Sequence, residues 1–135
     1  MKFLTYTMCI LMGLILLYVA IRPSVYVENQ MYDYGIIGKN KANTGTIIIE
    51  NKGLLPLKIK SIEGCCGLKI ISESKKALKK GEIQKISFVY NSSEVNPGRF
   101  NKTVTVDTND LLKKSIVIPV TGEVKLKENL ESSNM

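Results

Sequence analysis

The sequence contains no histidine and no tryptophan, and only three of its 135 residues are cysteine. Without an imidazole, the chain has no Ser-His or Cys-His nucleophile pair and no histidine-ligated zinc site. Asp33, Asp107 and Asp110 show no spacing that identifies a catalytic carboxylate pair. These absences exclude most hydrolase mechanisms. We therefore expect a protein that is not an enzyme, with no catalytic residues, no cofactor-binding residues and no cofactor.

The remaining composition is that of one folded, basic domain. Hydrophobic residues make up 44% of the chain and charged residues 23%, which is typical of globular rather than disordered proteins. The 19 lysines and arginines exceed the 12 acidic residues and give a net charge of +7. A chain of 135 residues accommodates one domain of ordinary size.

The longest charge-free stretch is residues 3–21, which read FLTYTMCILMGLILLYVAI. At about 1.5 Å per residue, a helix of this length crosses a hydrocarbon core of about 30 Å. The alternative is a cleaved signal peptide, which has an apolar part of roughly 7–15 residues and small residues before its cleavage site. Here Tyr18 lies two positions before the best candidate site, which follows Ala20. The length and the poor site favour a retained anchor.

This segment predicts the organisation of the whole chain. We expect an anchor over residues 1–22 with its helix at 3–21, a linker at 23–30, one domain at 31–124 and a polar tail at 125–135. A single anchor followed by a folded domain usually exports that domain. The sequence thus predicts a single-pass protein of the cell membrane with its C-terminal domain on the non-cytoplasmic, periplasmic side.

Beyond the anchor, short apolar runs with period two alternate with turn residues, a pattern that predicts an all-β antiparallel sandwich of about seven strands. Only residues 74–79 suggest a helical turn, so no crossover helices are available for a parallel sheet. The expected strands are 32–37, 44–50, 55–62, 67–72, 83–90, 99–107 and 115–124. The alternation places these side chains in the core: Ile47, Ile49, Leu57, Ile59, Phe88, Phe100, Val104, Val106, Ile118 and Val120.

Several motifs occur in a recognisable order. They are Asp33-Tyr34-Gly35, then Asn51-Lys52-Gly53 with Leu55-Pro56-Leu57, then Gly98-Arg99-Phe100 with residues 103–108, and finally Thr121-Gly122-Glu123-Val124. Over roughly residues 31–124 the chain resembles the bacterial family of domains of unknown function numbered 1573. The resemblance implies an immunoglobulin-like fold of the Hydin and PapD kind. The chain departs from the family pattern at Leu68, where the family often has the second cysteine of a Cys-Gly-Cys motif, and at Lys80-Gly81, where it tends to have Pro-Gly.

Cys65 and Cys66 are the metal-ligand candidates of the expected domain. Two adjacent thiols can form a strained disulfide, pair with another chain or bind a soft cation such as Cu(I). We expect instead that they are structural and bind no metal. On this interpretation they lie at the end of the strand carrying Leu57 and Ile59, with one side chain packed inward and the other on the opposite face.

Four lysines, Lys75, Lys76, Lys79 and Lys80, fall within six residues. Such a cluster can contact anionic lipid headgroups or an acidic partner, or it can form a solvated loop. Nucleic acid is not an expected partner, because no aromatic residues are interleaved with the lysines.

Two functional hypotheses remain. The first is a membrane-anchored, exported, immunoglobulin-like domain that binds an unidentified protein of the cell envelope without catalysis, because sandwiches of this kind accept partner strands at exposed edges. The alternative is a thiol-redox or copper-handling protein that acts through Cys65 and Cys66.

Overall fold

The computed structural model describes residues 1–93 and 95–126. The predicted polar tail therefore lies outside the described residues from position 127 onward. In chain order the elements are α1 (Lys2–Ile21), β1 (Val25–Val27), β2 (Tyr32–Gly38), β3 (Ala42–Asn51), β4 (Leu57–Gly64), β5 (Leu68–Ile70), β6 (Ala77–Leu78), β7 (Ile83–Asn91), β8 (Gly98–Thr108) and β9 (Ser115–Lys125).

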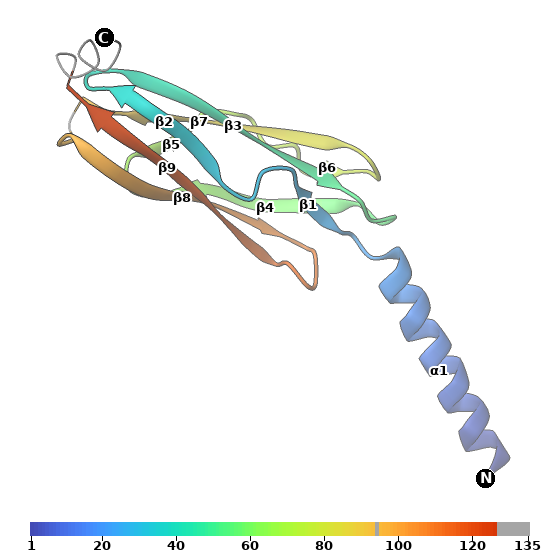
Figure 1. The fold of residues 1–135 in the computed structure, drawn as a ribbon. Coiled ribbons are helices and arrows are strands. Elements are labelled where there is room, and N and C mark those ends of the chain that lie inside the picture. The colour runs from blue at the N-terminus through green and yellow to red at the C-terminus, as the bar shows by residue number, and fades with distance from the viewer. Residues whose placement is uncertain (94, 127–135) are drawn as a thin grey trace.

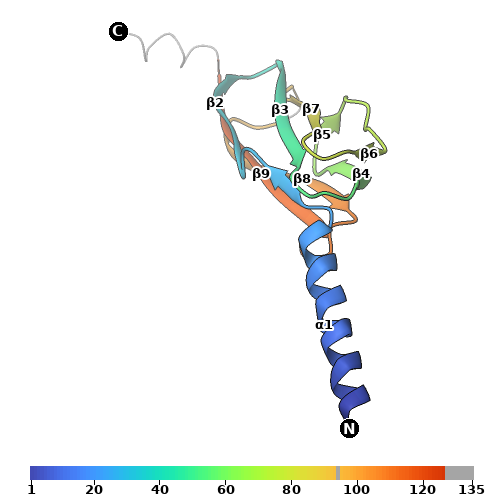
Figure 2. The same cartoon turned by 90° about the vertical axis from the view of Figure 1, so that its right-hand side faces the viewer.

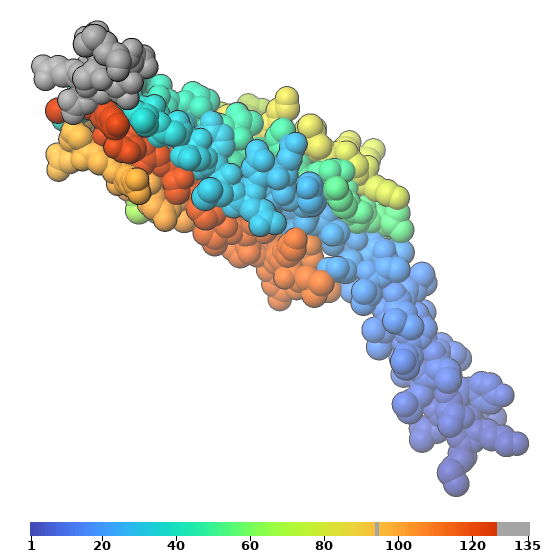
Figure 3. All heavy atoms as spheres, viewed as in Figure 1, coloured from blue at the N-terminus to red at the C-terminus, as the bar shows by residue number. Residues whose placement is uncertain are grey.

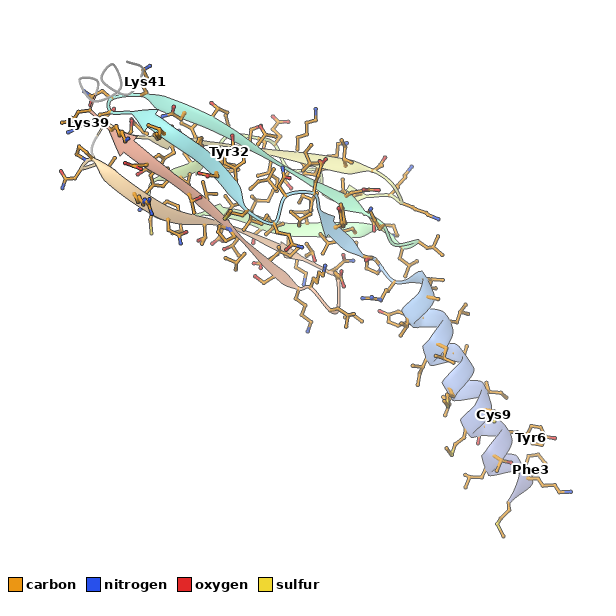
Figure 4. All side chains as sticks on the ribbon, in the orientation of Figure 1. Phe3, Tyr6, Cys9, Tyr32, Lys39 and Lys41 are labelled. Atoms are coloured by element: carbon orange, nitrogen blue, oxygen red, sulfur yellow. The ribbon has the colours of Figure 1, made fainter. Side chains whose placement is uncertain are left out.

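Helix α1 projects from one end of the β-domain, and none of the other described elements packs against it (Figure 3). Its side chains, among them Phe3, Tyr6 and Cys9, point outward all round (Figure 4). A helix that is apolar on every side is suited to a lipid environment. The 20 residues of α1 are long and apolar enough to cross a membrane, as a membrane anchor or a signal sequence does.

The strands form two sheets that pack as a sandwich (Figures 1 and 2). One sheet has the order β1-β3-β7-β5 and the other the order β2-β9-β8-β4-β6. The predicted immunoglobulin-like β-sandwich is therefore confirmed, with nine described strands in place of about seven. One pairing differs from the expectation, because β2 runs parallel to β9 whereas the other pairs are antiparallel.

The core lies between the sheets and consists mainly of the alternating side chains of the long strands. Nine of the ten predicted core residues are buried, and Phe100 is half-buried against them. Phe100 stacks on Tyr90, with ring centroids 4.3 Å apart, and Tyr32 and Tyr34 extend this aromatic contact from the neighbouring edge. The period-two pattern thus located the core because each of these strands buries one face.

Two local predictions are wrong. The expected linker, residues 23–30, contains β1, whose three residues pair with residues 49–51 of β3. The possible helical turn at residues 74–79 is instead extended, and Ala77 and Leu78 form β6 beside β4. Both strands are too short to show a period in the sequence, and pairing with a longer strand forms them.

The two ends of the sandwich differ in their relation to α1. The helix-proximal end comprises the β3–β4 loop (residues 52–56), the β6–β7 turn (residues 79–82) and the β8–β9 hairpin tip (residues 109–114). The distal end includes the β2–β3 turn, where Lys39 and Lys41 lie (Figure 4). The two ends of the sandwich therefore carry different loops, and only the helix-proximal loops lie next to α1.

Candidate functional site

Helix α1 is joined to the helix-proximal end by direct bonds rather than by a free linker. The Leu55 N–H donates to the Ile21 carbonyl at 2.9 Å, and the Lys52 N–H donates to the Ser24 carbonyl at 2.8 Å. Gly53 has to be glycine here, because a Cβ would lie 2.1 Å from the Arg22 carbonyl oxygen. The domain therefore has a defined orientation relative to the helix.

Asp110 completes this junction from the β8–β9 hairpin. Its carboxylate is buried, lies 3.3 Å from the Arg22 guanidinium, and accepts the N–H groups of Val25 at 3.0 Å and Leu112 at 3.0 Å. One carboxylate thus connects the end of α1, the start of β1 and the hairpin tip. The sequence showed Asp110 only as a carboxylate in a turn, so its structural role was missed.

A groove lies between β1 and the first half of β9. It encloses about 440 Å³, within the range of about 300–1,000 Å³ that ligand pockets occupy. Its lining residues are Tyr26, Val27, Gln30, Leu112, Lys113, Ser115, Ile116, Val117 and Ile118. The sequence did not predict it, because the groove depends on contact between β1 and β9, which are about 90 residues apart in the chain.

The β9 wall of this groove is an open strand edge. Because the Lys114 carbonyl accepts the Thr108 N–H, and backbone groups alternate in direction along a strand, those of Ser115 and Val117 point away from β8. Strand β2 covers that edge only from Val120 onward. Pro119, which has no N–H to donate, lies at the boundary between the covered and open parts.

The opposite wall also offers backbone groups. The Glu28 N–H donates to the Ile48 carbonyl, so by the same alternation the backbone groups of Val27 point away from β3 and toward the groove. Tyr26 is 42% exposed, and the Lys52 ammonium lies 3.8 Å from the centroid of its ring. An extended chain in the groove would meet hydrogen-bonding backbone on both sides and apolar side chains along its length.

A second depression, of about 550 Å³, is lined by residues of β2, β8 and β9, among them Ile36, Asn101 and Thr121. Its floor consists of β2, β9 and β8, which pair with one another there. The backbone groups of β8 and β9 are already used in the sheet there, so the floor of this depression offers side-chain contacts.

Cys65 and Cys66 form the turn that follows β4, at the predicted place in the chain. Neither side chain belongs to the core, so the expectation that one packs inward is wrong. Cys66 and Gly67 have φ of 52° and 93°, a left-handed turn that brings the two sulfur atoms to 2.8 Å from each other. Both thiols remain accessible on the surface.

The two thiols differ in acidity. The pKa of Cys65 is lowered, because its thiolate accepts hydrogen bonds from the Cys66 thiol and from Thr103, with Lys102 nearby. The pKa of Cys66 is raised, chiefly by that same hydrogen bond to Cys65 and by the charge of the Cys65 thiolate. Cys65 is therefore the more reactive nucleophile of the pair.

We expect iodoacetamide to modify Cys65 before Cys66, and at a lower pH than an ordinary thiol requires. Peptide mass mapping across a pH series would measure the two rates. Cys66→Ala should shift the Cys65 profile to higher pH, because it removes the main hydrogen bond, whereas Cys66→Ser retains a donor. Equal rates at both positions at every pH would contradict this assignment.

The described residues contain no group of three or more cysteine, aspartate or glutamate side chains that could hold a metal ion. Among the predicted contact lysines, all four are exposed, and Lys79 and Lys80 lie in the β6–β7 turn at the helix-proximal end. Lys75 differs from them, because its ammonium donates to the Ile83 carbonyl at 3.3 Å.

Several solved structures share this sandwich. A protein of unknown function from Porphyromonas gingivalis W83 is 16% identical with a TM-score of 0.65, over 77% of this chain and 48% of that chain. The present chain thus spans about half the length of that protein. The ASH/PapD-like domain 7 of human CEP192 is 12% identical with a TM-score of 0.56, over 76% of this chain and 85% of that chain.

A third similar structure is the secreted serine protease VesC from Vibrio cholerae, which is 12% identical with a TM-score of 0.58, over 77% of this chain and 23% of that chain. At these identities the likeness establishes the fold alone. No curated protein matches the sequence. The family model described as "Protein of unknown function (DUF1573)" matches residues 25–124, which is the sandwich from β1 to all but the last residue of β9, and the chain therefore belongs to the DUF1573 family.

Proposed function

We propose that this protein is a membrane-anchored, non-catalytic binding module whose groove between β1 and β9 takes up an extended segment of a cell-envelope protein. The observation that carries the proposal is the open edge of β9 at Ser115 and Val117, facing the free backbone groups of Val27. A strand that enters such an edge gains backbone hydrogen bonds, and its alternate side chains find pockets.

The side chains of the groove define the chemistry of this segment. Val117 is 57% exposed and Tyr26 is 42% exposed, so apolar residues of the partner would cover them. Lys113 lines the same groove and supplies a positive charge. The groove therefore suits an extended segment with alternating apolar residues and a carboxylate placed to meet Lys113.

The membrane location of the module rests on α1. As a retained anchor, α1 holds the sandwich at the cell membrane in a single-pass arrangement with the domain on the non-cytoplasmic side. Tethering keeps the groove at one membrane surface, where it meets partner segments at a high effective concentration.

Site-specific photocrosslinking in intact cells tests this function. With benzoylphenylalanine at Tyr26, we expect one adduct of defined mass in the membrane fraction. Val117→Pro should abolish the adduct because it removes the outward N–H, whereas Val117→Thr keeps that donor and should preserve it. The mass of the uncrosslinked protein from the same membranes shows whether residues 1–21 are retained.

Two outcomes would contradict the proposal. An adduct that is unchanged by Val117→Pro would mean that the partner does not pair with the β9 edge. A protein shortened to an N-terminus near Ile21 would end the anchor interpretation while leaving the groove untouched. A crosslinker at Ile36, which is 54% exposed near the distal end, serves as the matched control and should give no such adduct.

A further inference from the structure

Two pairs of leucines are exposed at the helix-proximal end. Leu54 and Leu55 lie in the β3–β4 loop and are 53% and 37% exposed, and Leu111 and Leu112 lie at the β8–β9 hairpin tip and are 50% and 75% exposed. Large apolar side chains that are exposed together and rimmed by polar residues mark a protein or membrane contact surface. Here both loops carry the same Leu-Leu pair.

Both loops contact the end of α1. The Leu55 N–H bonds to the carbonyl of Ile21, the last residue of the helix, and the Leu112 N–H bonds to the Asp110 carboxylate that pairs with Arg22. In Figures 1 and 2 the β8–β9 hairpin tip reaches as far along the helix axis as the end of α1. A membrane that contains α1 would therefore begin at the level of these leucines.

The charges of this end suit a lipid surface. Its three loops hold five lysines (Lys52, Lys79, Lys80, Lys113 and Lys114) and two acidic residues, of which Asp110 is buried against Arg22. Lysines next to exposed apolar side chains are typical of protein segments that lie in the interface of an anionic bilayer. An apolar tip with a basic rim is therefore complementary to anionic headgroups above acyl chains.

From this juxtaposition we infer that the two leucine pairs insert into the membrane interface beside α1 and fix the sandwich on the bilayer. This inference rests on the proposed retention of α1 as the anchor. The bilayer then has three attachment points on the domain, namely the helix and the two loops. The Arg22–Asp110 junction sets the level of the loops relative to the helix, so the β1–β9 groove is held near the membrane surface.

The absence of tryptophan from the chain permits a direct test, because each single tryptophan introduced is the only one present. Full-length Leu111→Trp and Leu54→Trp are reconstituted into phosphatidylcholine–phosphatidylglycerol vesicles that contain lipids with brominated acyl chains. We expect a blue-shifted emission and loss of fluorescence to the bromines at both positions. Ile36→Trp, equally exposed near the distal end, should keep a water-like emission and remain unquenched.

Met12→Trp in the middle of α1 separates this inference from the proposed anchor. Quenching at position 12 without quenching at 111 and 54 would overturn the loop insertion and leave the anchor standing. No quenching at position 12 would overturn the anchor itself. Lys113→Glu combined with Lys114→Glu should reduce quenching at position 111, and unchanged quenching there would overturn the role of the basic rim.

Discussion

Val104→Asp is expected to unfold the sandwich. Val104 is fully buried in the middle of β8, where it pairs with Ile118 of β9 and Gly64 of β4. An aspartate there would place an unpaired carboxylate in the core at a cost of several kcal/mol, against a total stability of about 5–15 kcal/mol for a domain. Urea unfolding of the full chain in detergent micelles, followed by β-sheet circular dichroism, measures the loss.

The matched control is Val117→Asp on the adjacent strand. Val117 is also a strand valine, but it is 57% exposed and lies in the groove, so we expect a change within about 0.5 kcal/mol. If Val104→Asp unfolds at the same urea concentration as the parent chain, the register of β8 is wrong.

This pair of valines also shows what the sequence could predict. The alternation of Val104, Val106, Ile118 and Val120 indicated the buried faces of β8 and β9 correctly, because a strand that buries one face has to place apolar residues at every second position. The alternation of short apolar runs with turn residues likewise predicted a β-sandwich. These are local patterns, and each is contained within one strand or turn.

The features that the sequence did not predict depend on contacts between residues far apart in the chain. Strand β1 has three residues and exists because β3 and the Asp110 carboxylate take up its backbone groups. The parallel pairing of β2 with β9 joins residues almost 90 positions apart, such as Tyr32 and Val120. After β1 the chain crosses to the other sheet, where β2 pairs with β9 only from Val120 onward. The first half of β9 therefore stays uncovered beside β1, and the groove lies between them. No local pattern contains that information.

The geometry of the Cys65–Cys66 pair is a further feature that the sequence could not predict. The sequence placed Cys65 and Cys66 correctly after a strand, but the direction of each side chain depends on the backbone angles of the turn. Cys66 has φ of 52°, which non-glycine residues adopt infrequently, and this turn brings the sulfurs together instead of sending them to opposite faces. The different acidities of the two thiols follow from that geometry.

The fold by itself does not decide between functions, because the same sandwich occurs in part of a secreted protease and in a human PapD-like domain. The proposals for this chain rest instead on its helix-proximal end, where α1, the groove and the leucine loops adjoin. Asp110 lies at the centre of that arrangement, and removing it tests whether the arrangement depends on a fixed junction.

Asp110→Ala is expected to destabilise the domain by about 2–4 kcal/mol, because it leaves the N–H groups of Val25 and Leu112 without an acceptor and the Arg22 guanidinium without its partner. Arg22 is partly exposed and regains water, which keeps the cost below that of a fully buried ion pair. Amide hydrogen exchange locates the effect. The Val25 amide should exchange at least about tenfold faster, since each 1.4 kcal/mol of local opening free energy corresponds to that factor.

The control is Glu28→Ala, which removes an exposed carboxylate one residue beyond β1. Because no hydrogen bond or ion pair involves that side chain among the described residues, neither the unfolding free energy nor the Val25 exchange rate should change measurably. Asp110→Asn provides an intermediate case, because its amide oxygen can still accept one backbone N–H while the charge on Arg22 goes unpaired. Equal protection of the Val25 amide in Asp110→Ala and in the parent chain would show that the Asp110 carboxylate does not hold β1, and that the pairing with β3 and the bonds from the β3–β4 loop to Ile21 and Ser24 fix the junction without it.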